Sequence, residues 1–107
     1  MRDTDPDRFR LARINGAAGH YAHLRELTSE QEDEALATIT MAAAGRTDLL
    51  AHAAGILLGF HEGTPGEARA RHTADLLIKA GADQRQIPRW TEEGRRRAHP
   101  SLPGDRP

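Results

Sequence analysis

The sequence predicts an all-α domain, a compact bundle of four to five short helices with disordered termini. Helix-boundary residues recur along the chain, and the apolar residues between them repeat every three or four positions. The 107 residues are enough for one modest hydrophobic core. We therefore expect a single helical domain over residues 6–98, a disordered segment over residues 1–5, and a disordered tail containing proline and glycine over residues 99–107.

The first helix is expected to begin at Asp5-Pro6, because aspartate accepts hydrogen bonds from a first helical turn and proline is tolerated there. Its apolar spacing continues to Leu27. Gly16 and Gly19 each weaken the helix by about 1 kcal/mol relative to alanine. A kink, or a division into two short helices, is therefore an alternative there.

The second helix is expected to begin at Thr28-Ser29 and to end at Gly45. Gln31 and Glu32 occupy the two positions from which a side chain can complete a capping box. Acidic residues are concentrated near this start, where the helix dipole favours negative charge.

The third helix is expected to be capped by Thr47 or Asp48 and to run to about Phe60. It is apolar on most sides, which predicts a buried helix at the centre of the bundle. Small residues recur along it every four positions, and they would let a neighbouring helix approach closely: Ala51, Gly55 and Gly59.

The segment Thr64-Pro65-Gly66-Glu67 has the composition of a capping box, so the fourth helix is expected over Pro65–Ala80. Gly81 supplies a helix C-terminus. Asp83 is expected to cap a short turn, and the last helix is expected from Pro88 to about Ala98.

The segment Leu76–Asp83 resembles the end of an ankyrin repeat, and Gly45–Leu49 resembles the beginning of one. In that family the two points lie closer together than Gly45 and Gly81 do here. The Thr-Pro-Leu-His motif of the family is absent, and one repeat cannot bury its own apolar face. We therefore interpret Leu76–Asp83 as an ordinary helix C-terminus.

Several functional classes find no support in the composition. The chain has no cysteine, which excludes disulfides, thiolate metal sites and cysteine nucleophiles. It has no nucleophile elbow, phosphate-binding loop or dinucleotide fingerprint. We therefore expect no enzymatic activity, no cofactor and no small-molecule substrate. No signal peptide or membrane-spanning stretch is visible, so the expected location is the cytoplasm.

By elimination, the sequence predicts a small regulatory or accessory protein that contacts a protein partner or a second copy of itself. Aromatic residues and arginines are enriched at such interfaces. The candidate contact surface consists of Trp90, Ile87, Phe60 and Leu102. A simpler interpretation of Trp90 is that it packs the last helix onto the bundle.

A nucleic-acid-associated accessory protein is the first alternative. Residues 85–107 carry six arginines and three acidic residues, a net charge of +3, whereas residues 1–44 carry five basic and eight acidic residues, a net charge of −3. Five arginines are candidates for phosphate contacts: Arg85, Arg89, Arg95, Arg96 and Arg97. The arginine-rich end could instead fold onto the acidic residues 30–34.

A histidine-based metal site is the second alternative. His20 and His23 lie three residues apart on one helical face, and a bundle could bring other histidines toward them. The candidate ligands are His20, His23, His52 and His72. No spacing among them is diagnostic, and histidines on the surface or in ordinary hydrogen bonds remain the simpler interpretation.

Overall fold

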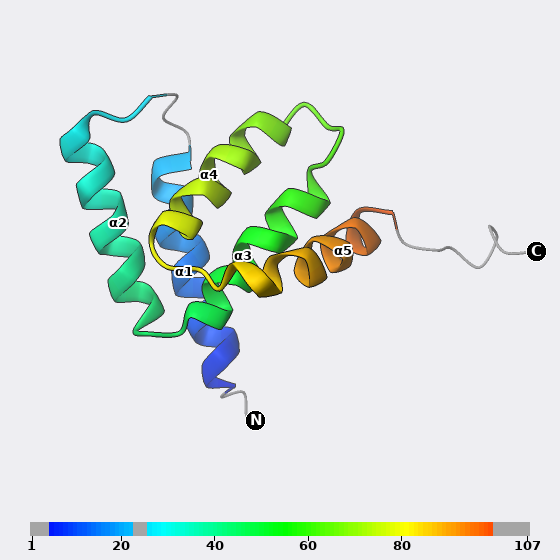
Figure 1. Cartoon of the computed structure of the whole chain (residues 1–107), viewed down its shortest axis with the longest axis horizontal. Coiled ribbons are helices and arrows are strands. Elements are labelled where there is room, and N and C mark those ends of the chain that lie inside the picture. The colour runs from blue at the N-terminus through cyan, green and yellow to red at the C-terminus, as the bar shows by residue number, and fades with distance from the viewer. Residues whose placement is uncertain (1–4, 23–25, 100–107) are drawn as a thin grey trace, which may run out of the picture.

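The computed structural model describes residues 5–22 and 26–99, and these residues form helices and no strand. The elements are α1 (Pro6–Ala22), α2 (Ser29–Ala43), α3 (Thr47–Phe60), α4 (Glu67–Lys79), the 3₁₀ turn η1 (Gln84–Gln86) and α5 (Ile87–Ala98) (Figure 1). The all-α prediction is confirmed. Most of the two ends predicted to be disordered, and the candidate residues His23 and Leu102, lie outside the described residues.

Local hydrogen bonds fix the starts of α1 and α2 where the sequence predicts them. Asp5 Oδ1 accepts from the Asp7 amide at 3.0 Å. Thr28 Oγ1 accepts from the Gln31 amide at 3.0 Å, and Gln31 Oε1 accepts from the Thr28 amide at 2.9 Å. Of the two predicted capping-box positions, Gln31 is therefore the one used.

The length of α1 differs from the prediction. The helix passes through Gly16 and Gly19 without a break over its described range, Pro6–Ala22. Leu27, predicted as the last apolar residue of this helix, instead lies just before α2 and packs against the core. The capped start at Thr28 assigns Leu27 to the connection between the two helices.

The predicted capping box at the start of α4 is wrong. Thr64 Oγ1 accepts from the Gly66 amide at 3.2 Å and donates to the His61 carbonyl at 2.7 Å. The carboxylate of Glu67 pairs with Arg71 at 2.9 Å, so it does not return to Thr64. The helix begins at Glu67, two residues later than predicted.

The predicted cap of α3 is also wrong, because neither Thr47 nor Asp48 occupies the cap position. The cap residue is Arg46, and its guanidinium pairs with Asp48 at 2.9 Å and with Asp7 at 2.7 Å. The Asp48 carboxylate thus belongs to an ion-pair network that joins α1 to the start of α3.

The core surrounds α3, which packs against α1, α2, α4 and α5. This confirms the prediction of a central third helix. Leu57, on the same helix, is only partly buried. The largest fully buried side chains come from four helices: Ile14, Ile39, Leu50, Leu76 and Leu77.

Helices α3 and α5 lie side by side (Figure 1), and glycines set their close approach. A Cβ added to Gly59 would lie 2.8 Å from the Arg95 amide nitrogen, and one added to Gly94 would lie 2.6 Å from the Ile56 carbonyl oxygen. Gly55 is equally confined against α5. The predicted close helix approach is confirmed for Gly55 and Gly59, and the neighbour is α5.

Candidate functional site

Trp90 joins α5 to α3, as in the simpler interpretation of this residue. Its indole stacks on the imidazole of His52, with ring centroids 3.8 Å apart and planes 11° from parallel. The Arg89 guanidinium lies 4.9 Å from the centre of the indole. The Trp90 Nε1–H is enclosed and has no hydrogen-bond partner in the described part of the chain. Trp90 therefore packs α5 against α3, and its side chain is partly buried.

The other members of the candidate contact surface differ in exposure. Ile87 is partly buried against the core, whereas Phe60 is 43% exposed and meets His61 edge to face at 5.1 Å. Two further large apolar side chains are exposed, Phe9 at 64% and Met41 at 78%. Nothing in the sequence distinguished these two, because an apolar residue on a short helix gives no direct signal of its exposure.

Most of the candidate arginines of η1 and α5 are already paired with carboxylates. Arg95 Nε meets Glu62 at 2.6 Å, and this bidentate pair lowers the pKa of the Glu62 carboxyl. Three of the others also meet acidic side chains: Arg85 with Asp83, and Arg96 and Arg97 with Glu93. These pairs reduce the uncompensated positive charge available for phosphates.

The acidic start of α2 has a different partner from the one considered above. Glu32 pairs with Lys79 of α4 at 2.9 Å, and Lys79 also meets Asp75 at 3.3 Å. Arg95, Arg96 and Arg97 of α5 pair with Glu62, Glu92 and Glu93 instead. None of these ion pairs joins an arginine of α5 to the acidic residues 30–34, as that alternative required.

The described candidate histidines lie in different surroundings. His20 meets the ring of Tyr21 at 4.8 Å, His52 stacks on Trp90, and His72 has an enclosed Nε2 atom without a hydrogen-bond partner. Burial, together with the nearby charge of Arg97, lowers the pKa of the His52 imidazole. Among the residues that the structure describes, no three histidine, aspartate or glutamate side chains gather as metal ligands.

A cleft that the sequence did not predict opens on one side of the bundle. It lies between α1, α3 and the first half of α4 and has a volume of about 900 Å³. Its apolar lining includes Leu11 and Ala18 of α1, Ile56 and Leu57 of α3, and Ala70 of α4. Only the packing of three helices creates this cleft, so no local sequence pattern marks it.

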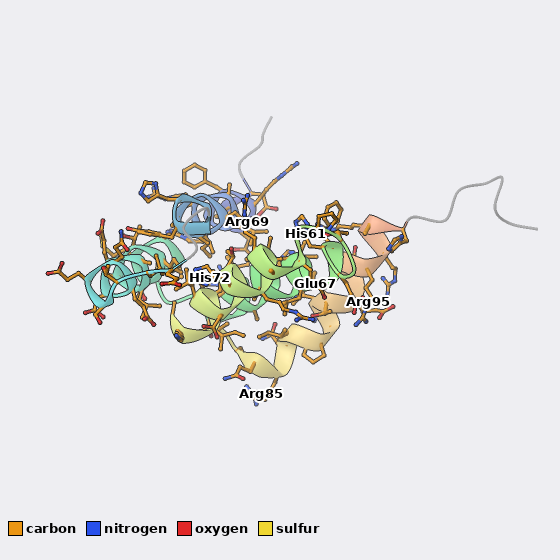
Figure 2. All side chains as sticks on the ribbon, turned by 90° about the horizontal axis from the view of Figure 1, so that it is seen from above. His61, Glu67, Arg69, His72, Arg85 and Arg95 are labelled. Carbon is orange, nitrogen blue, oxygen red and sulfur yellow. The ribbon has the colours of Figure 1, made fainter. Side chains whose placement is uncertain are left out.

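The two arginines that line the cleft are Arg69 of α4 and Arg97 of α5. Three histidines also line it: His52, His61 and His72. No carboxylate occurs among the described residues that line it. Arg69 and His61 lie toward the side of the molecule that faces α1, whereas Arg85 lies on the opposite side (Figure 2).

Comparisons with known proteins provide no relative from which the role of this cleft could be inferred. No protein-family model, curated protein or solved structure is significantly similar to the chain. The interpretation of Leu76–Asp83 as an ordinary helix end agrees with its place at the end of α4, where Gly81 has φ +119°. Within the described ranges, no helix has both the length and the apolar character needed to cross a membrane.

Proposed function

We propose that this chain is a cytoplasmic, non-enzymatic accessory protein that acts by contacting another protein or a second copy of itself. The observation that carries the proposal is the exposure of Phe60, which is 43% accessible at the end of α3. Aromatic side chains, phenylalanine among them, are enriched at protein interfaces.

The surroundings of Phe60 support a preformed contact point. Its amide nitrogen would lie 2.9 Å from a Cβ on Gly94, so the end of α3 is held closely against α5. Two residues further on, Glu62 receives the bidentate hydrogen bonds of Arg95. A surface that is already ordered loses less conformational entropy when a partner binds.

Site-specific photocrosslinking tests the proposal. The photoreactive residue p-benzoylphenylalanine replaces Phe60 in the full chain within cells of the source organism, and lysates are divided into nuclease-treated and untreated portions. The matched control carries the same residue at Met41, which is also exposed and apolar but lies on α2. We expect a nuclease-resistant protein adduct at position 60 and none at position 41.

Two outcomes would contradict the proposal: adducts at both positions alike, or no protein adduct at position 60. An adduct that disappears after nuclease treatment would instead support the nucleic-acid alternative. Light scattering of purified wild type, Phe60→Ser and Met41→Ser decides whether the partner is a second copy. In that case only Phe60→Ser should lower the measured mass, with the helical circular dichroism unchanged.

A further inference from the structure

Arg69 is an arginine without a partner at the edge of the cleft between α1, α3 and α4. Its guanidinium makes no hydrogen bond or ion pair with any described residue, although its carbonyl accepts from Thr73. Arg71 lies two residues away and pairs with Glu67. The two arginines share a helix, and only Arg69 lines the cleft.

A second polar group in the cleft also lacks a partner. His72 lies one turn after Arg69 and lines the same cleft, and its Nε2 atom is enclosed without a hydrogen bond to any described residue. Enclosed polar atoms are normally hydrogen-bonded in folded proteins. The cleft is thus lined by an unpaired cation and by an imidazole whose unsatisfied Nε2 atom has almost no surface open to it.

The rest of the cleft suits an apolar body. Its volume of about 900 Å³ lies within the range of small-molecule sites, which is about 300–1,000 Å³. Aliphatic side chains from three helices line it, and no described lining residue carries negative charge. Such a cleft favours a ligand that is apolar over most of its length and anionic at one end.

From this geometry we propose that the cleft binds an apolar monocarboxylate, with the carboxylate on Arg69 and the hydrocarbon portion between α1 and α3. The planar guanidinium matches a carboxylate in a bidentate, charge-assisted contact. Arg69 is exposed at the edge of the cleft, and of the two described arginines that line it only Arg69 has no ion pair, since Arg97 pairs with Glu93, so the free charge fits a ligand with one negative charge. Phe60 does not line this cleft, and the ligand proposal does not depend on the protein contact proposed at Phe60.

Three probes with unbranched chains of about ten carbon atoms and head groups of different charge test the charge preference. Sodium decanoate, 1-decanol and decyltrimethylammonium are titrated into the full chain below their aggregation concentrations, with heat and amide NMR shifts as readouts. We expect decanoate to bind most tightly and to shift amides of the three helices around the cleft. Equal binding of decanol, or preferred binding of the cation, would overturn the carboxylate assignment.

Two matched pairs of variants locate the site. Arg69→Gln should weaken decanoate binding about tenfold and leave decanol unaffected, because a hydrogen bond to a charged group is lost. Arg71→Gln serves as the control on the same helix. Both Gly16 and Gly19 have open space around an added Cβ, so the fold should tolerate leucine at either position. Only Gly19 lines the cleft, so Gly19→Leu should block decanoate binding and Gly16→Leu should not.

Equal effects of both members of either pair would refute the placement of the ligand. Absence of decanoate binding to the wild type would also overturn the proposal, as would NMR shifts centred on Phe9 and Met41 instead of the cleft. The glycine pair keeps the test valid even if an arginine substitution alters the fold, because either glycine replacement should favour the helix.

Discussion

Replacing Gly59 by alanine is expected to destabilise the protein, although the same change stabilises an ordinary exposed helix by about 1 kcal/mol. The new methyl group would lie 2.8 Å from the Arg95 amide nitrogen, whereas ordinary contacts begin at 3.4 Å. It would lie closer still to the carbonyl of Thr91. Both obstacles are backbone atoms, which cannot rotate away, so α5 has to withdraw from α3.

The magnitude follows from these two opposing effects. Overpacking of a well-packed site costs about 1–3 kcal/mol, and the rigid backbone on the α5 side places Gly59 near the upper end. After the gain in helix propensity is included, we expect Gly59→Ala to lower the free energy of unfolding by about 2 kcal/mol. Gly16→Ala is the control, because nothing lies within 4 Å of a Cβ added at Gly16. This substitution should raise the free energy of unfolding by about 1 kcal/mol.

Urea unfolding measures both variants, with far-ultraviolet circular dichroism for helix content and Trp90 fluorescence for the contact between α3 and α5. The Trp90 signal is suitable because its indole stacks on His52 across that contact. Opposite signs of the two stability changes are the expected result. If Gly59→Ala is as stable as the wild type, with unchanged Trp90 fluorescence, the close approach of the two helices is not as described.

Two further predictions concern the core and the contact between α1 and α3. Leu50→Ala should lower the free energy of unfolding by about 2–5 kcal/mol, because Leu50 is fully buried. Leu57→Ala should lower it less, because Leu57 is only partly buried, and equal losses in urea unfolding would contradict this difference in burial. Arg46 lowers the pKa of the Asp7 and Asp48 carboxyls below the ordinary value of 3.8, so their pairing stabilises the fold above that pH and is lost as the pH falls through the lowered values. Arg46→Gln should therefore lower the melting temperature at neutral pH. The difference in melting temperature from the wild type should become smaller below pH 3.8 and with added salt. A difference that does not change with pH would show that the ion pairs of Arg46 are not its cause.

The sequence by itself determined where α1 and α2 begin. The capping box of Thr28 and Gln31 and the accepting oxygen of Asp5 link residues two or three positions apart, so their geometry is settled within one turn. The same local reasoning failed at Thr64, because Glu67 took Arg71 as its partner. A local motif therefore predicts a helix end only when no other partner competes for its side chains.

The tertiary structure alone decided which residues meet across the bundle. Arg46 reaches Asp7 over 39 positions of the chain, and Arg95 reaches Glu62 over 33. Helix packing directions set these pairings, and they also leave Arg69 unpaired beside a cleft built by three helices. The glycines of α3 predicted that another helix packs closely against it, but only the folded chain shows that this helix is α5. The candidate ligand site could not be predicted from the sequence for the same reason, since its walls and its charge come from segments far apart in the chain.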